Sequence, residues 1–406
     1  MLNLTVIMKN NWQTKKLSEL SKRKNAVVSG PFGSNLKVSD YINEGVPILR
    51  LQNIGKGFFI NKDIKYISKI KAEELKYHYF ISGDIALAKL GIPIGKTCII
   101  PNNITSGIIT ADIVRIRPDK NTINYNFLEY VLNADISVNQ LIKNISGATR
   151  PRVNLSEVRN LQIPLPPLTE QHRIVKILDE VFADVAKAKE NAEKNLRNAK
   201  ELFESYLQSV FANPGKDWEE KKLGDIGKVS MCKRVFKHQT TKTGDIPFYK
   251  IGTFGKEPNA YISNKIYNEF RKKFSFPKKG DILISASGTI GRRVKYDGEP
   301  AYFQDSNIVW IDNDENQIIN DYLYHFYGAC NWDSTKGATI SRLYNDNLKQ
   351  IKIAFPKSLS EQKSIVAKLD ALSTETKKLE AIYKQKLANL EELKKSVLNK
   401  AFAGEL

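Results

Sequence analysis

The sequence predicts an α+β protein in which two similar mixed α/β domains are separated by two long α-helices that form an antiparallel coiled coil. Three observations lead to this prediction. The second half of the chain repeats the first, two segments contain the short apolar runs typical of strands, and a long heptad pattern follows each segment. Together they describe one unit of domain and helix that occurs twice, with a pseudo-two-fold relation between the copies.

The repeat is clearest where each domain passes into a helix. The segment GATRPRVNLSEVRNLQIPLPPLTEQHRIVKILD starts at Gly147, and GATISRLYNDNLKQIKIAFPKSLSEQKSIVAKLD starts at Gly337. The offset is 190 residues at these glycines and 191 at Asp179 and Asp370. Three shorter pairs agree: WQTKKLSEL with WEEKKLGDI, VPILRLQNIGKG with IPFYKIGTFGKE, and GDIALAKLG with GDILISASG. A period near half the chain length indicates two copies of one large unit rather than a solenoid of short repeats.

The two copies divide the chain into four segments. Residues 1–168 and 213–359 contain short apolar runs separated by Gly, Asn, Asp and Pro, which is typical of strands and turns, with helices expected near 125–136 and 318–327. Residues 169–212 and 360–406 are expected to be the long helices.

Each helical segment begins with a capping signal and continues without Gly or Pro over about 42 residues, or ~60 Å. Thr169 and Ser360 occupy expected N-cap positions, and Glu170 and Glu361 follow them, where an acid interacts favourably with the helix dipole. The first expected seam is Ile174, Leu178, Val181, Val185, Ala188, Ala192, Ala199, Leu202 and Tyr206. The second is Ile365, Leu369, Leu372, Leu379, Tyr383, Leu390, Leu393 and Val397.

Chain connectivity predicts the direction of the two helices. Only the short segment ANPGKD separates the end of the first helix from the second domain, which then leads into the second helix. The end of one helix and the start of the other must therefore lie within about one domain of each other, so the pair is antiparallel. The alternative is that each helix packs only on its own domain, which is common for shorter helices.

The net charge of +19 indicates a polyanionic partner, either nucleic acid or an anionic membrane surface. Residues 1–168 contribute +11 and residues 213–359 contribute +7, so the excess lies in the two domains rather than in a basic tail. This distribution argues against a simple membrane anchor, and we expect no signal peptide and no membrane-spanning segment. Three widely spaced cysteines, Cys98, Cys232 and Cys330, fit a reducing cytoplasmic compartment.

Motifs for catalysis are missing from the sequence. GIPIGKT at residues 91–97 resembles a phosphate-binding loop, but three residues separate its glycines where that motif has four, so a Gly-rich turn is the preferred interpretation. The four histidines share no metal-ligand spacing, and the Asp/Asn-Pro-Pro-Tyr/Phe motif of nucleic-acid amino-methyltransferases does not occur. We therefore expect a protein that binds rather than catalyses, with no metal and no cofactor of its own.

The candidate DNA-binding residues lie on loops that combine Gly with basic and amide side chains at matched places in both repeats. Such side chains fit base edges in the major groove, and an unpartnered Lys or Arg more often contacts phosphate. The alternative for any single residue is a solvated surface charge. The candidates in the first half are Ser34, Asn35, Lys37, Arg50, Gln52, Asn53, Lys89, Arg150 and Arg152. Those in the second half are Lys233, Arg234, Lys237, Lys250, Thr253, Ser287, Arg292, Arg293 and Arg342.

The order of domain, helix, domain and helix, with LPPLTEQHRIVKILD and FPKSLSEQKSIVAKLD at the junctions, resembles the specificity (S) subunit of type I restriction-modification systems, the HsdS family. SGPFGSNLK, GDILISASGTIGRR and KAFAGEL are also similar to segments of that family, and the resemblance covers nearly the whole chain. It implies a non-catalytic subunit with two target recognition domains, each reading one half of a bipartite sequence in double-stranded DNA.

The same resemblance implies the partners. The helices would set the spacer between the half-sites and dock two methyltransferase (M) subunits, which modify adenine N6 with S-adenosylmethionine. Restriction (R) subunits, which use ATP, would join that complex to cleave unmodified DNA. Three alternatives stay open at this point: a specificity subunit of a methylation-only system, a coiled-coil scaffold for protein or RNA, and an enzyme in its own right.

Overall fold

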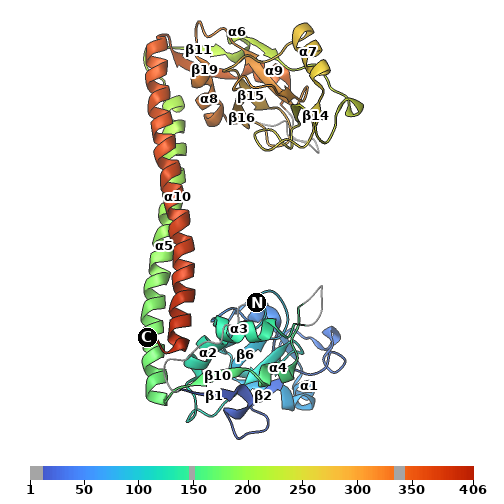
Figure 1. Cartoon of the computed structure of the whole chain (residues 1–406), viewed down its shortest axis with the longest axis vertical. Helices are drawn as coiled ribbons and strands as arrows, with labels where there is room; N and C mark the ends of the chain where they lie inside the picture. The colour runs from blue at the N-terminus through green and yellow to red at the C-terminus, as the bar shows by residue number, and fades with distance from the viewer. Residues whose placement is uncertain (1–11, 146–150, 333–342) are drawn as a thin grey trace. The chain divides into compact units, whose positions relative to one another are not determined.

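The computed structural model describes residues 12–145, 151–332 and 343–406. The chain forms two compact units, one of Met1–Ala192 with Lys386–Leu406 and the other of Glu193–Gln385. Each unit contains one mixed α/β domain and a part of each of two long helices, α5 (Leu168–Ala212) and α10 (Leu359–Ala403) (Figure 1). The predicted fold class is therefore confirmed.

Domain 1 is built from two four-stranded sheets and one two-stranded sheet. The central antiparallel sheet has the order β2 (Val27–Ser29), β9 (Ile113–Ile116), β6 (Ile85–Ala88) and β7 (Thr97–Ile99). The outer sheet has the order β4 (Lys65–Ile67), β3 (Val46–Leu49), β8 (Ser106–Ile109) and β5 (Tyr79–Ile81), and β3 and β8 are parallel. A pair of β1 (Gln13–Lys16) and β10 (Gln162–Leu165) closes the domain next to α5.

Domain 2 repeats this topology, which confirms the internal repeat, except that its described outer sheet has three strands and no counterpart of β5. Its central sheet has the order β12 (Lys228–Ser230), β18 (Ile308–Asp312), β15 (Ile282–Ser285) and β16 (Arg293–Lys295). Its outer sheet contains β14 (Tyr261–Ile262), β13 (Ile246–Tyr249) and β17 (Tyr302–Phe303), with β13 and β17 again parallel. Strands β11 (Trp218–Lys222) and β19 (Lys352–Pro356) form the closing pair.

The short helices complete both domains. In domain 1 they are α1 (Lys69–Glu74), α2 (Tyr125–Asn133), α3 (Asp135–Ile142) and α4 (Leu155–Arg159), so the helix expected over 125–136 is interrupted at Ala134. In domain 2 they are α6 (Leu223–Ile226), α7 (Asn264–Lys273), α8 (Asn320–Ala329) and α9 (Asn345–Gln350).

The central sheet is buried on both faces, because its strands are apolar at successive positions rather than at alternate ones. In β6, Ile85 and Leu87 pack on one side against Phe127 and Val131 of α2. The intervening alanines of β6 face the other way and pack with residues of the outer sheet. Domain 2 has the same three layers, with α8 in the place of α2.

A buried glutamine joins the first long helix to domain 1. Gln171 is fully buried, and its Oε1 accepts a hydrogen bond of 2.7 Å from the backbone N–H of Asn124, at the start of α2. Its Nε2 donates to the carbonyls of Pro166 at 2.8 Å and Thr122 at 3.3 Å. One side chain therefore links α5, the end of β10 and the start of α2.

The second junction uses the same arrangement. Gln362 of α10 is also fully buried, and its Oε1 accepts from the backbone N–H of Ile319 at 3.0 Å, at the start of α8. Its Nε2 donates to the carbonyls of Pro356 at 2.7 Å and Gln317 at 2.8 Å. The two glutamines occupy the same place in the repeated Glu-Gln dipeptides, so the repeat preserves this contact.

The helices begin one residue before the expected caps. Because α5 starts at Leu168, Thr169 lies inside its first turn instead of at the N-cap position. Helix α10 starts at Leu359, and the Ser358 hydroxyl accepts a 3.4 Å hydrogen bond from the N–H of Glu361. The cap of the second helix is thus Ser358 rather than Ser360.

Within each unit the two helices run antiparallel. In the first unit the start of α5 meets the end of α10, where Lys189 pairs with Glu391 at 2.7 Å. There Phe402 of α10 is buried in the core of domain 1, with its ring 5.6 Å from that of Phe127. In the second unit the end of α5 meets the start of α10, and Phe211 and Val366 share the core of domain 2.

Burial along the helices corrects the expected seams. The residues at the start of α5 behave as expected, since Ile174 and Leu178 are buried. Farther along, Leu202 is 52% exposed, whereas Leu207 is 3% exposed. Four residues of the expected seams are exposed to solvent: Leu202, Tyr206, Leu379 and Leu393. Thr376 of α10, which is not part of the expected seam, is buried. The physical reason is that an α-helix has 3.6 residues per turn, so a strict seven-residue repeat drifts around its surface.

We predict that replacing Gln171 with Leu lowers the free energy of unfolding by about 2–4 kcal/mol, because one buried N–H and two buried carbonyls lose their partner. Urea-induced unfolding measures this change. His172→Ala, at the exposed next position, is the matched control and should stay within ~0.5 kcal/mol of the parent. Equal effects of the two changes would contradict the role given to Gln171.

A second prediction tests the corrected seam. Leu207→Ala should cost about 2–4 kcal/mol in unfolding free energy, since it leaves a cavity, whereas Leu202→Ala should cost less than ~1 kcal/mol. Thermal or urea unfolding of the two variants compares them directly. A larger loss of unfolding free energy for Leu202→Ala than for Leu207→Ala would support the strict heptad, in which Leu202 lies in the seam.

Candidate nucleic-acid interface

In domain 1, loops that follow the central strands meet at one edge through backbone hydrogen bonds. The N–H of Thr110, after β8, donates to the carbonyl of Leu49 at the end of β3, at 3.0 Å. The N–H of Lys89, after β6, donates to the carbonyl of Asp112 at 2.8 Å. The ends of β3, β6 and β8 therefore place their following side chains close together.

Domain 2 holds its loops with the same bonds. The N–H of Gln304 donates to the carbonyl of Tyr249 at 3.0 Å, and that of Ala286 donates to the carbonyl of Asn307 at 2.7 Å. These bonds define structural counterparts between the domains. The pairs are Thr110 with Gln304, Lys89 with Ala286, and Asp112 with Asn307.

Four polar side chains come together at this edge of domain 1. Lys89 donates from Nζ to the Ser29 hydroxyl at 2.7 Å, and Arg152 pairs with Asp112 at 2.5 Å. The Lys89 side chain is half-buried, and burial lowers the pKa of its ammonium group, with Arg152 nearby adding to this effect. Lys89 and Arg152 thus lie at the same edge, and both are partnered within the domain.

The other candidates of domain 1 lie on two further loops. Ser34, Asn35 and Lys37 are exposed, and Phe32 beside them is 84% exposed. The sequence interpretation omitted Phe32, although an aromatic residue between two glycines in a loop is a recognisable signal for base stacking.

Arg50 and Gln52 converge on one carboxylate. Arg50 Nη2 and Gln52 Nε2 donate to Oδ2 of Asp63 at 2.8 and 3.0 Å, and Lys65 contacts Oδ1 at 2.8 Å. Lys65 first, then Arg50 and Gln52, hold the pKa of the Asp63 carboxyl well below its usual range. These side chains are oriented by Asp63 before any ligand arrives.

Two candidates close turns instead of facing solvent, which corrects their assignment. Asn53 is fully buried, its Oδ1 accepts from the N–H of Arg50, and its Nδ2 donates to the carbonyls of Ile60 and Lys62. Thr253 has the matching role in domain 2, where its hydroxyl accepts from the N–H of Lys250 at 3.1 Å. Both residues support the loops that carry Arg50 and Lys250.

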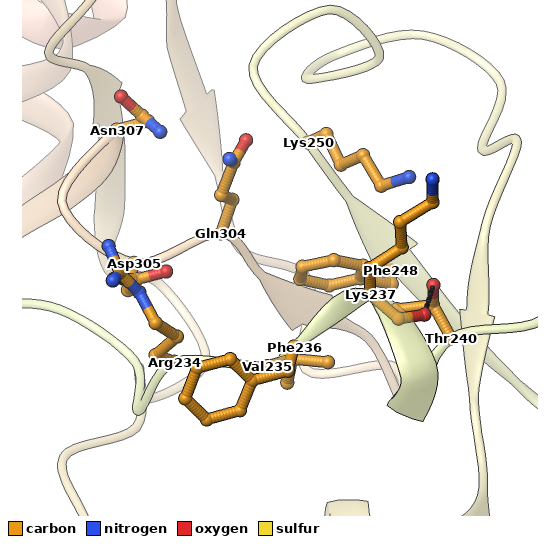
Figure 2. A pocket seen from close by; sticks show the side chains of 10 residues that line it. All are labelled: Arg234, Val235, Phe236, Lys237, Thr240, Phe248, Lys250, Gln304, Asp305 and Asn307. Atoms are coloured by element: carbon orange, nitrogen blue, oxygen red, sulfur yellow. Dashed lines mark hydrogen bonds and ion pairs between the residues drawn. The ribbon is translucent and has the colours of Figure 1, made fainter.

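Domain 2 has a hollow of about 360 Å³ at the same edge (Figure 2). It brings together the loop after β12, the end of β13 and the loop between β17 and β18. Three sequence candidates, Arg234, Lys237 and Lys250, line it. The other lining residues are Val235, Phe236, Thr240, Phe248, Gln304, Asp305 and Asn307. Lys233 lies close by in sequence and places its Nζ 4.9 Å from the centre of the Phe274 ring.

Two further candidates of domain 2, Ser287 and Arg292, make hydrogen bonds within the domain. Ser287 is buried and donates to Oδ1 of Asn307 at 2.7 Å, so it supports the hollow from below its surface. Arg292 donates from Nη1 to the carbonyl of Phe254 at 2.9 Å.

Arg293 does not join the basic residues of the hollow. Its guanidinium lies 4.6 Å from the centre of the Tyr324 ring on α8, and it lines a separate cleft beside α5 and α10 that also contains His325 and Asp370. Adjacent residues of a strand point to opposite faces, so Arg292 and Arg293 separate at the start of β16. Arg150 and Arg342 lie outside the described residues.

The glycine-rich segment at residues 91–97 is a turn between strands. It connects β6 to β7, where Gly95 donates to the carbonyl of Ala88, and the buried Thr97 hydroxyl donates to the carbonyl of Gly95 at 2.9 Å. These groups are used within the domain and do not form a phosphate cradle.

Within residues 12–145, 151–332 and 343–406, no group of three or more His, Cys, Asp or Glu side chains is placed to hold a metal ion. The helices of this described part include none that is long and apolar enough to cross a membrane.

A family model for the type I restriction modification DNA specificity domain matches the chain twice, at residues 9–195 and 215–391. The chain belongs to this family. As a type I specificity (S) subunit, it is the DNA specificity component of a restriction-modification system and not its catalytic component.

Similar proteins agree with this assignment. One relative is the type I restriction enzyme specificity subunit S.HindORF215P of Haemophilus influenzae. It is 47% identical to this chain over 268 residues, which cover 65% of this chain and 68% of that protein. The StySPI specificity subunit of Salmonella potsdam is 22% identical and covers 97% of this chain and 89% of its own length.

Solved structures support the fold. A chain from a study of complex assembly and conformational transition in a type I R-M system has a TM-score of 0.78 at 21% identity, covering 98% of this chain and 99% of that one. The HsdS subunit from Thermoanaerobacter tengcongensis has a TM-score of 0.60 at 19% identity, covering 98% of both chains. Two mixed domains with long paired helices are thus the shared architecture.

For this S subunit we expect the cations of the hollow to contact DNA. Lys237→Ala should weaken DNA binding by the complex that contains this S subunit and reduce the slope of log affinity against log salt by about 1, because one phosphate contact is lost. Arg292→Ala is the matched control, since its guanidinium is used inside the domain, and should leave the slope unchanged. A reduced slope for Arg292→Ala alone would show that the hollow is not the contact surface.

Proposed function

We propose that each domain of this S subunit recognises one half of a bipartite target in double-stranded DNA. In this proposal residues 1–168 and 213–359 are the two target recognition domains, and residues 169–212 and 360–406 are the helices between and after them. The net charge supports the proposal, because the two domain segments contribute +11 and +7 of the total +19. Basic surfaces of this kind supply the sequence-independent part of DNA affinity.

The observation that carries the proposal is the contrast between a shared frame and different side chains. Matched backbone bonds hold the same loops in both domains, yet Thr110, Lys89 and Asp112 are replaced by Gln304, Ala286 and Asn307. The donors and acceptors that the two edges present are therefore different. Since base edges are distinguished by their donor and acceptor patterns, two such domains would read two different half-sites.

We further propose that α5 and α10 set the spacer between the half-sites and dock two methyltransferase (M) subunits. Both helices contain 45 residues and include no Gly or Pro, so they can transmit a fixed length. The M subunits would methylate adenine N6 with S-adenosylmethionine, and restriction (R) subunits using ATP would join the complex in the cytoplasm. These partners follow from the family and fit a subunit whose own chain holds no catalytic motif.

Co-expression with the methyltransferase subunit in a methylation-free bacterial host tests the proposal. Single-molecule sequencing for modified adenine should reveal one motif with two short half-sites and a fixed gap, which disappears when this chain is omitted. A continuous motif, or one that persists without this chain, would overturn the bipartite proposal.

We predict that removing residues 186–192 from α5 together with 388–394 from α10 shortens the gap by about three base pairs, because seven helical residues span ~10.5 Å and a base pair ~3.4 Å. The two half-sites should stay the same. Sequencing of methylated adenines in the variant measures the new gap. Removing only one of the segments puts the helices out of register and is the control that should abolish methylation. An unchanged gap in the double deletion would show that the helices are not the spacer.

A further inference from the structure

The hollow of domain 2 differs from an ordinary basic patch because its amide side chains are fixed by the protein. Gln304 and Asn307 lie on the loop between β17 and β18, and both are half-buried. In Figure 2 the Gln304 side chain lies between those of Asn307 and Lys250. The inference below concerns what these groups can bind, and it rests on the proposed function of domain 2.

The orientation of the Gln304 amide follows from its partner. Oε1 of Gln304 accepts a 2.9 Å hydrogen bond from the backbone N–H of Ile251. A backbone N–H can only donate, so the oxygen of the amide must face Ile251 and the NH₂ group must face away. Gln304 therefore offers a donor to a ligand, while its acceptor is used within the domain.

Asn307 is arranged in the same way. Its Oδ1 accepts a 2.7 Å hydrogen bond from the hydroxyl of the buried Ser287, which leaves the NH₂ group for a ligand. The backbone of this loop is also held in place, since the carbonyl of Asn307 accepts from the N–H of Ala286. Both amides therefore present their NH₂ groups, which are donors, to a ligand.

The charged residues of the hollow add further donors. Lys237 and Lys250 line it, and Nζ of Lys250 lies 6.0 Å from the centre of the Phe248 ring. The carboxylate among the lining residues, Asp305, already accepts a 2.9 Å bond from Nε of Arg234. Among the described residues that line the hollow, no hydrogen bond or ion pair within the domain uses the side-chain nitrogens of Gln304, Asn307, Lys237 and Lys250 or the two Nη atoms of Arg234.

This pattern discriminates between bases. A glutamine or asparagine that recognises adenine in the major groove needs both its oxygen and its nitrogen, because adenine offers N6 as a donor and N7 as an acceptor. In Gln304 the N–H of Ile251 already occupies one lone pair of the oxygen and holds that oxygen toward the protein, so this geometry favours Gln304 as a donor over the two-sided contact that adenine needs. Guanine offers two acceptors, N7 and O6, on its major-groove edge, and a surface of donors matches it.

We propose that the half-site of domain 2 contains a guanine whose N7 and O6 atoms accept hydrogen bonds from Gln304 and Lys250, with Asn307 as a neighbouring donor. Phosphate oxygens are also acceptors, and amide side chains contact them as cations do, but such contacts carry no sequence information. The two amides are half-buried and rigidly oriented, which suits the reading of a base edge.

Domain 1 has a different composition at the matching places. Thr110 donates its hydroxyl hydrogen to the carbonyl of Leu49 at 2.9 Å, and Asp112, the counterpart of Asn307, is an acceptor paired with Arg152. The proposal therefore applies to one half-site alone, and the other half-site of the same target serves as an internal reference.

The test uses the complete methyltransferase complex. After sequencing of modified adenines has defined the wild-type motif, the same measurement is made with Gln304→Glu, which keeps the acceptor for Ile251 and replaces the donor by a second acceptor. We expect the preference for guanine to be lost at one position of one half-site, while the other half-site and the gap stay unchanged. Gln350→Glu makes the same charge change at an exposed position of α9 and should leave the whole motif unchanged.

A chemical substitution in the DNA tests the proposal without altering the protein. Replacing the guanine by 7-deazaguanine removes the N7 acceptor and should weaken binding of the wild-type complex by about five- to ten-fold. This experiment decides the question even if Gln304→Glu does not fold.

The possible outcomes are distinct. A bipartite motif with no guanine in either half-site overturns this proposal and leaves the proposed function intact. So does a uniform loss of affinity in Gln304→Glu with an unchanged motif, which would indicate a phosphate contact. Failure to obtain any bipartite motif with the wild-type complex would instead contradict the proposed function itself.

Discussion

The architecture depends on one hydrogen-bonded side chain that occurs twice. Gln171 and Gln362 each connect a long helix to the end of the strand before it and to the N-cap residue of a domain helix, with no exposure to solvent. A buried amide satisfied on both sides allows essentially one orientation, since each unmet partner costs about 1–3 kcal/mol. The angle at which a domain leaves its helix is therefore specified by a local contact. Each domain therefore keeps its orientation on its own helix only if the hydrogen bonds of Gln171 or Gln362 stay intact.

The shared joints explain how a common frame can carry different binding surfaces. The matched bonds between the loops join backbone groups, so they form in both domains although the side chains there differ. The positions of Gln304 and Asn307 are therefore occupied by Thr110 and Asp112 in domain 1 on the same backbone frame. Domain 2 even accommodates an additional residue in the loop between β17 and β18, where Ser306 adopts a φ of 59°. The backbone bonds that hold the loops are therefore shared by the two domains, whereas the side chains proposed to read DNA differ between them.

Much of the fold could be predicted from the sequence, because the repeat, the strand runs and the long helices leave periodic signals. The details that failed have physical reasons. In the sequence, the Glu-Gln dipeptide suggests only a favourable interaction of the glutamate with the helix dipole. In the structure the glutamine makes the important contacts, and its partners in the domain include Asn124, 47 residues from Gln171, and Gln317, 45 residues from Gln362. Leu202 was placed in the seam by a strict heptad, and the true helical period moved burial to Leu207.

The candidate site was less predictable than the fold. Composition predicts which loops to consider, but burial and hydrogen-bond partners decide which side chains are available to a ligand, and neither is visible in the sequence. Asn53 and Thr253 closed turns, and Arg293 turned to the opposite face of its strand. Gln304 and Asn307 were missed because they become neighbours of Lys250 only through a parallel pairing of strands β13 and β17, which are distant in the chain.

The burial of Phe402 in domain 1 has a consequence for biosynthesis. Leu398, Ala401 and Phe402 belong to the same core as Phe127, so the first domain to leave the ribosome lacks part of its interior until α10, which follows domain 2, has been translated. The nascent domain therefore stays incomplete, and accessible to chaperones and proteases, while all of domain 2 is synthesised.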